Sequence, residues 1–389
     1  KVYNSGFQEY NGSLFLGLTK KWGYSHLNIS TFNTTLNMVE GERDSLGNFI
    51  YASPDGNGST TEVSASTEDL KGYTVGFPHQ EVQHLRVLNN NYFILRKGSV
   101  NLDLGYQNNK RQEFGDVLNP ADKALFFDLN TFNYNLRYNF SEIKGWETSL
   151  GISGMQQEST NKGLEFLIPE YSLFDIGSFV FSQKTFNKLT FAGGVRFDTR
   201  IISSEKLILD SLGAPINTED NTTELKFKEL KKMYSSYSGS IGLSYQINKK
   251  STLKFNLSRG FRAANISEIA SNGRHEGTLR FEYGTPELKP ELSHQIDLAY
   301  FINSDHVTFE FTPFTNLISN YIFSEKLTST SGGDSIPDLL DPAPAYKFAQ
   351  ANATLIGGEI YLDVHPHPFD WLHIENSFSY VQATQNKQS

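Results

Sequence analysis

The sequence contains no cysteine among its 389 residues and only three methionines. Without cysteine, neither a disulfide framework nor a thiolate metal site can form. No stretch approaches about 18 consecutive apolar residues, so no segment is predicted to be a transmembrane helix. This absence does not exclude a membrane, because the strands of transmembrane barrels alternate apolar and polar residues and give only a weak hydropathy signal.

Positive charge is scarce as well. The formal net charge is −9 at pH 7, and the chain shows no basic patch. Nucleic-acid-binding proteins present a basic surface, so we expect no nucleic-acid partner. Enzyme motifs are missing too: the sequence has no G-x-S-x-G, H-E-x-x-H or P-loop, and we therefore expect that the protein is not an enzyme.

Aromatic residues and glycine are abundant, with 30 Phe, 19 Tyr and 31 Gly. Aromatic side chains favour strands and glycine marks turns, so the composition favours many strands over helices. The alternation of apolar and polar residues predicts about fourteen strands. They span residues 12–20, 22–33, 81–96, 98–112, 127–140, 146–160, 171–185, 188–200, 234–247, 251–262, 292–302, 307–323, 347–365 and 371–385.

The segment 251–262 shows the alternation clearly. Leu253, Phe255 and Leu257 lie on one face, since successive side chains of a strand point to opposite sides. The other face is polar, and across the predicted strands this polar face carries charges of both signs. Such a face suits a water-filled or plugged lumen better than a dry core.

The connections between the predicted strands alternate strictly between short and long. A meander that closes on itself would gather the short turns at one rim and the long loops at the other, as in outer-membrane barrels with short periplasmic turns. We therefore predict an all-β fold, an antiparallel transmembrane β-barrel, in which residues 1–389 form one partial barrel domain. The predicted extracellular loops are 34–80, 113–126, 161–170, 201–233, 263–291 and 324–346.

A motif in residues 258–291 resembles the late-barrel signature of TonB-dependent outer-membrane receptors. Its matching residues are Arg259, Gly260, Phe261, Arg262, Asn265, Glu268, Glu276, Gly277, Leu288, Lys289, Pro290 and Glu291. The chain departs from the family at Ala264, where proline is usual. Residues 107–114 (QNNKRQEF) resemble a run found in Bacteroidetes-type members of the family.

The resemblance implies a barrel of about 22 strands whose lumen is filled by an N-terminal plug domain. We expect this chain to be the central portion of such a barrel, without the plug and without a few strands at each end. Lys1 is not followed by an apolar region, so we also expect any signal peptide to have been removed.

The resemblance also implies a function. The protein would reside in the outer membrane, in contact with lipid, and import a ferric siderophore or a similar iron chelate. The energy would come from the TonB complex, acting through the plug, and no resident cofactor is expected. A passive porin, an adhesin barrel, a receptor for cobalamin or a glycan-derived solute, and a soluble β-rich surface protein are the alternatives.

Six basic side chains, expected in or near the extracellular loops, are candidates for binding the cargo. These are Arg111, His79, His84, Arg274, His275 and Arg280. A guanidinium suits an anionic chelate, but Arg111 has acidic neighbours, Glu113 and Asp116, with which it would otherwise pair. The charges of residues 263–291 have the same two interpretations: a ligand-contacting surface, or a scaffold that pairs within itself and orders the loop.

Direct binding of free metal is not predicted. His365 and His367 have the spacing of a metal pair, but the alternation of connections places them on a short periplasmic turn. Gly273, Gly277 and Gly284 are expected to form turns.

Overall fold

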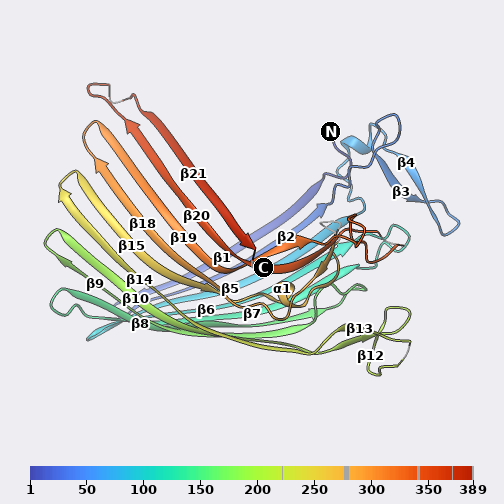
Figure 1. The fold of residues 1–389 in the computed structure, drawn as a ribbon, viewed down its shortest axis with the longest axis horizontal. Coiled ribbons are helices and arrows are strands. Elements are labelled where there is room, and N and C mark those ends of the chain that lie inside the picture. The colour runs from blue at the N-terminus through green and yellow to red at the C-terminus, as the bar shows by residue number, and fades with distance from the viewer. Residues whose placement is uncertain (221, 276–279, 340–341, 370, 388–389) are drawn as a thin grey trace.

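The protein is a curved sheet of long antiparallel strands in the computed structural model, which describes every residue except 221, 276–279, 340–341, 370 and 388–389 (Figure 1). Glu276 and Gly277 of the signature motif therefore lie outside the described residues. No helix in the described part of the chain has the length and apolar character needed to cross a membrane.

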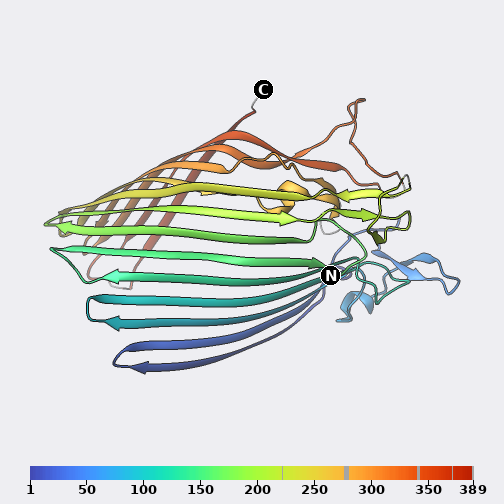
Figure 2. The same cartoon turned by 90° about the horizontal axis from the view of Figure 1, so that it is seen from below.

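Fourteen long strands follow one another in chain order across the sheet, each paired antiparallel with its neighbours (Figure 2). They are β1 (Phe7–Lys20), β2 (Gly23–Asn37), β5 (His79–Leu95), β6 (Gly98–Phe114), β7 (Leu125–Phe140), β8 (Trp146–Asn161), β9 (Tyr171–Phe186), β10 (Leu189–Ser204), β14 (Leu230–Asn248), β15 (Ser251–Arg262), β18 (Glu291–Asn303), β19 (Val307–Lys326), β20 (Ala345–Val364) and β21 (Ile374–Lys387). The predicted all-β antiparallel architecture is confirmed.

The connections alternate as the sequence predicts. Short turns lie at one rim of the sheet, on the left in Figure 1, and long connections lie at the opposite rim. The long connections are not irregular throughout, because they contain small elements of their own. These are β3 (Ile50–Pro54), β4 (Thr60–Ser64), η1 (Asp69–Lys71), β11 (Leu207–Leu209), β12 (Pro215–Ile216), β13 (Glu224–Phe227), α1 (Ile266–Ala270), β16 (Asn272–His275) and β17 (Arg280–Tyr283).

The two faces of the sheet differ in polarity. On the outer face, Leu257 of β15 lies opposite Ile241 of β14 and Ile296 of β18, and all three side chains are exposed. On the inner face, Asn256 donates a hydrogen bond to Asp297 (3.0 Å). An exposed apolar face of this extent suits lipid, because a soluble protein rarely exposes a large contiguous apolar patch.

Aromatic rings gather beside the short turns. Trp22 stacks on Phe93 with ring centroids 5.5 Å apart, and Trp146 contacts Phe191 at 6.2 Å. Amphipathic rings of this kind are enriched where a membrane protein crosses the lipid–water interface. Their position at the ends of the strands fits a girdle at that boundary.

The sheet does not close on itself. Among the described residues, β1 pairs with β2 alone and β21 pairs with β20 alone. Such edges expose unpaired backbone N–H and C=O groups, which pair readily with further strands. The expectation of a larger barrel of about 22 strands stays a prediction.

Candidate functional site

The signature motif builds a compact structure on the inner face of the sheet, at the end that carries the long connections (Figure 1). Its short helix α1 begins at Asn265, whose side chain accepts a hydrogen bond from the Glu268 backbone N–H (2.9 Å). In return, the Glu268 carboxylate accepts from the Asn265 backbone N–H (2.9 Å). This reciprocal capping box satisfies two donors that a helix start otherwise leaves unpaired.

Arg262 connects the motif to two strands. Its guanidinium donates to both carboxylate oxygens of Glu268 (2.9 Å each) and to Glu291 at the start of β18 (2.5 Å). The other oxygen of Glu291 accepts from the Ile322 backbone N–H of β19 (2.6 Å). A planar guanidinium suits two carboxylates at once, which a lysine ammonium does not match.

Apolar packing holds α1 against the sheet. Ile269 is fully buried, in a cluster with Ile202 of β10 and Tyr234 of β14. Burial of a side chain the size of isoleucine stabilises a fold by roughly 1.5–3 kcal/mol. The charged residues of the motif are therefore anchored from below by hydrophobic contacts.

Two glycines of the motif serve close packing, which corrects the expectation that they form turns. A Cβ atom at Gly284 would lie 2.3 Å from the backbone nitrogen of Ala270 in α1, and one at Gly273 would lie 2.8 Å from the Phe166 carbonyl oxygen. Gly273 lies within β16, and neither residue has a positive φ. The close approach of two backbone segments explains both glycines. Gly277 lies outside the described residues.

The hairpin of β16 and β17 folds over the rim, where β17 pairs in parallel with β20. Buried Glu282 accepts a hydrogen bond from Arg280 (2.7 Å) and lies 3.5 Å from the His275 ring. The contacts with His275 and Arg280 outweigh burial and hold the pKa of Glu282 below its ordinary value of 4.5. These candidate residues therefore pair within the hairpin, as one of the two interpretations predicts.

This pKa shift makes the hairpin sensitive to acid. Because the pKa of Glu282 is lower in the folded protein, its ionised form contributes stability above the unfolded pKa, and that contribution is lost as the pH falls through the folded pKa. We expect the protection of amides in residues 272–275 and 280–283 against exchange, relative to the intrinsic rate at each pH, to stay constant above the unfolded pKa of about 4.5 and to fall as the pH drops below it. Glu282→Gln should exchange faster at neutral pH and lose this dependence. An unchanged pH profile in that variant would contradict the assignment.

A cavity of about 770 Å³ lies at the same rim, among the connections 38–78, 115–124 and 162–170 and strand β16. Its volume falls in the range of small-molecule sites, about 300–1,000 Å³. The lining residues are Leu36, Asn37, Met38, Val39, Glu40, Pro78, Glu113, Phe114, Gly115, Asp116, Asp122, Ala124, Leu164, Glu165 and Arg274. This mouth cavity, defined by these residues, is the candidate site.

Only some of the residues predicted to bind the cargo lie in or beside the mouth cavity. Arg274 lines it directly. Arg111 forms an ion pair with Glu113, a lining residue, so that it pairs with an acidic neighbour, as one of its two interpretations predicts. His79 stacks on Phe114 (4.6 Å), while its Nδ1 lies 3.0 Å from the Gly76 carbonyl oxygen.

The remaining candidates do not line the cavity. His84 lies on β5, where its Nδ1 is 3.2 Å from Asn109 Nδ2. His275 and Arg280 contact Glu282. The apolar lining, such as Leu164 and Phe114, was not predicted, because no local sequence signal marks an apolar residue as cavity-lining. The short helix α1 was not predicted either, although the spacing of Asn265 and Glu268 is a capping-box signature that could have indicated it.

The charge of the mouth cavity is predominantly negative. Five of its lining residues are carboxylic acids, and Arg274 is the only lysine or arginine among the described lining residues. Hydrogen bonds from the side chain of Asn119 and the backbone of Leu118 lower the pKa of Asp116, so that this residue is ionised at neutral pH. The site therefore disfavours strongly anionic ligands.

A second cavity, of about 650 Å³, opens on the inner face of the sheet. Arg200 donates two hydrogen bonds to Asp175 (2.8 and 2.6 Å), and Arg196 pairs with Asp198 (2.6 Å). Both pairs line the cavity together with Asp103 and Arg262. The inner surface is thus polar and charged, and its charges are largely paired with one another.

These observations define part of a transmembrane β-barrel: a meander with an apolar outer face, a charged inner face, short turns at one rim and a ligand-sized cavity at the other. A family model described as "TonB dependent receptor-like, beta-barrel" matches residues 3–389. The chain belongs to the family of TonB-dependent receptors. This confirms the predicted family and its location in the outer membrane, and the family is one of transport proteins, as expected for a chain predicted not to be an enzyme.

Solved structures show the same fold. The copper transporter OprC superposes with a TM-score of 0.68 at 13% identity, covering 97% of this chain and 53% of its own. The siderophore receptor PirA from Acinetobacter baumannii gives 0.63 at 15% identity, covering 100% and 55%. The receptor HasR of Serratia marcescens, solved with its hemophore HasA and heme, gives 0.64 at 13%, covering 97% and 54%.

No curated protein sequence gave a significant match. The chain spans about half the length of the structures that it matches. At these identities the likeness shows the fold alone. The cargo therefore has to be argued from the residues of the mouth cavity.

Proposed function

We propose that this chain is the barrel portion of a receptor that imports an iron chelate across the outer membrane, with energy supplied through TonB. The mouth cavity is the observation that carries the proposal, since it lies at the long-loop rim and has the volume of a small-molecule site. A wide polar lumen needs a plug to prevent leakage, and the charged inner surface around Arg200 and Asp198 suits contact with a polar plug domain.

The charge of the mouth cavity narrows the class of cargo. Five acidic lining residues against one lysine or arginine favour a chelate that is neutral or positively charged over a multiply charged anion. The apolar lining, which includes Leu36, Phe114 and Leu164, would contact the organic part of the ligand. A neutral or cationic iron chelate meets both requirements.

Uptake in cells tests this function. We expect the product of the complete gene to import radiolabelled neutral or cationic iron chelates under iron limitation, and to lose that uptake in cells without TonB. Uptake that is indifferent to TonB, combined with ion conductance in planar bilayers, would replace the receptor with a passive porin. Uptake restricted to cobalamin or a glycan-derived solute would keep the receptor but overturn the proposed cargo.

A large side chain at Gly115 should block the mouth cavity. A Cβ atom there meets nothing within 4 Å, and the residue has no positive φ, so that Gly115→Trp adds bulk without backbone strain. We expect at least about a tenfold loss of chelate affinity, corresponding to about 1.4 kcal/mol. Gly115→Ala is the matched control and should bind normally. Equal binding by the two variants, measured by equilibrium binding to membranes, would exclude this cavity.

A further inference from the structure

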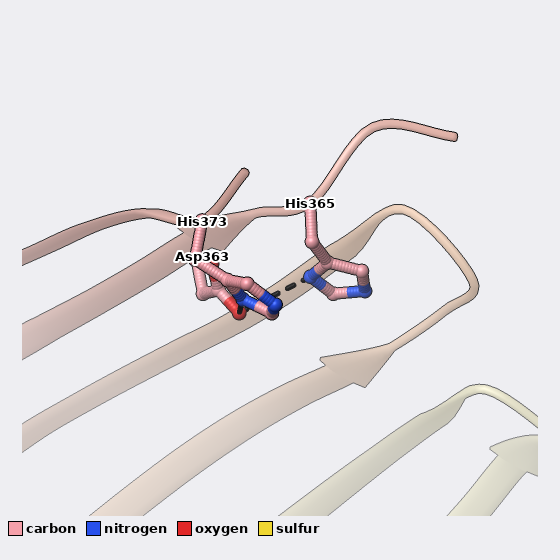
Figure 3. Close-up of side chains that lie close together, drawn as sticks. All are labelled: Asp363, His365 and His373. Carbon is pink, nitrogen blue, oxygen red and sulfur yellow. Dashed lines mark hydrogen bonds and ion pairs between the residues drawn. The ribbon is translucent and has the colours of Figure 1, made fainter. Parts of the chain in front are cut away.

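Three potential metal ligands lie together at the opposite rim, where β20 turns into β21 (Figure 3). Asp363 is the penultimate residue of β20, His365 follows the strand, and His373 precedes β21. Asp363 Oδ2 lies 3.1 Å from His365 Nδ1 and 3.2 Å from His373 Nδ1. The two imidazole rings stack with centroids 5.5 Å apart.

The strand register explains this arrangement. Val364 pairs with Ile374 at the end of the ladder, so the next residues along the two strands, His365 and His373, face each other across the turn. Asp363 and His365 are two residues apart and so point to the same side of the strand. The sequence spacing suggests His365 and His367 as a pair, whereas the structure brings His365 together with Asp363 and His373.

The carboxylate at the centre of this group is buried. Asp363 is only 8% exposed, and its Oδ1 has no hydrogen-bond partner among the described residues. A buried carboxylate oxygen needs a hydrogen bond or a cation to offset the loss of hydration. Both imidazole contacts fall on Oδ2, so they leave Oδ1 unsatisfied.

The hydrogen bonding of His365 favours a metal ion as the partner of this carboxylate. Its Nε2 lies 3.3 Å from the carbonyl oxygen of Ser304, and a carbonyl only accepts, so Nε2 carries the proton. In neutral His365, Nδ1 then presents a lone pair toward an anionic carboxylate. A metal ion bound between Nδ1 and the Asp363 carboxylate uses the nitrogen lone pair and neutralises the buried anion that both carboxylate oxygens share, and the Ser304 contact is the outer-shell hydrogen bond that commonly orients a ligating histidine.

We propose that Asp363, His365 and His373 bind a divalent d-block cation, with Zn²⁺ as the best match. Two donors about 2.0–2.1 Å from a tetrahedral metal lie about 3.3 Å apart, close to the two separations at Asp363 Oδ2. One ligand atom from each residue lies within 4.8 Å of the others. Two imidazoles with one carboxylate favour Zn²⁺ or its neighbours over Ca²⁺ and Mg²⁺, and leave a fourth position open.

The proposed metal site lies at the short-turn rim, and the mouth cavity lies at the opposite rim. The metal proposal therefore does not depend on the proposed cargo. The bound ion would connect the end of β20 to the residue that begins the return into β21. A second histidine pair, His306 and His367, lies at the same rim with ring centroids 5.0 Å apart. That pair offers a demanding control, because it tests whether metal binding needs Asp363 or only nearby imidazoles.

Calorimetric titration with Zn²⁺ tests the proposal. The protein would be the product of the complete gene, purified in detergent and stripped of metal with a chelator. We expect one Zn²⁺ per chain with a Kd of about 1 µM or tighter. His365→Asn, His373→Asn and Asp363→Asn should each weaken binding at least about tenfold. His367→Asn and His294→Asn, the latter on β18, should bind as the unmodified protein does.

Either of two outcomes would contradict the proposed metal site. Failure of the unmodified protein to bind Zn²⁺ would show that a protonated histidine pair, rather than a metal, satisfies Asp363. Binding lost in His367→Asn and retained in His373→Asn would assign the ion to the other pair. Circular dichroism and heat-modifiable migration on gels establish that each variant is folded. As an independent readout, Co²⁺ should give the visible absorption of a tetrahedral site in the unmodified protein and in His367→Asn.

Discussion

Replacement of Arg262 with methionine is expected to open the structure formed by the signature motif. The substitution leaves Glu268 and Glu291, both largely buried, without the guanidinium that pairs with them. Breaking a fully buried ion pair from one side costs about 3–5 kcal/mol, but the Arg262 side chain is 43% exposed, so we expect about 2–3 kcal/mol here. This corresponds to about 30- to 150-fold more frequent local opening.

Limited proteolysis and amide exchange across residues 263–290 would measure this opening. Arg262→Lys keeps the charge but lacks the planar fork, and should recover only part of the protection. Arg137→Met is the matched control, because among the described residues this guanidinium donates a single long hydrogen bond, to Asn101 (3.3 Å). If Arg262→Met and Arg137→Met behave alike, the ion pairs around Arg262 contribute nothing to the order of the motif.

A single charge on the outer face should impair insertion, whereas the same charge one residue away should be tolerated. Ile296 lies on the apolar outer face, and Gln295 lies on the inner face, where it donates a hydrogen bond to Asp297 (2.6 Å). Arginine at the bilayer midplane on a lipid-facing strand costs about 2–4 kcal/mol. We therefore expect Ile296→Arg to lose about 30-fold or more in folding equilibrium, and Gln295→Arg to lose much less.

Denaturant titration of the complete protein in lipid vesicles would give both values. Folded protein is distinguished by its heat-modifiable migration on gels. The two variants carry the same added charge at consecutive positions of β18. A difference between their folding free energies is therefore caused by the face of the strand on which the charge lies. Equal losses would mean that the outer face of β18 does not meet lipid.

The signature motif shows how far local sequence reasoning reaches. The sequence offered two interpretations of its charges, and the structure supports internal pairing for Arg262, Arg280 and Glu282. Arg274, from the same hairpin, also lines the mouth cavity. The sequence does not show which of these charged residues line a cavity. That depends on which segments pack against the hairpin, and those segments come from distant loops.

The sequence by itself determined the strands and their order. Alternation such as that of Leu253, Phe255 and Leu257 is set by neighbours along the chain, because the pleat places every second residue on the same face. The strict exchange of short and long connections then required a meander with two unlike rims. The residues of the signature motif, in turn, were sufficient to indicate the family.

Only the tertiary structure decided which distant residues meet. Arg274 of β16 and Glu113 of β6 line the same mouth cavity although they are distant in the chain, and His373 lies beside Asp363 because of the register of β20 and β21. A strand pattern repeats every two residues and fixes a face, but not the depth at which a turn begins or the curvature of the sheet. The two candidate sites depend on those quantities, so they emerge only when the chain is folded.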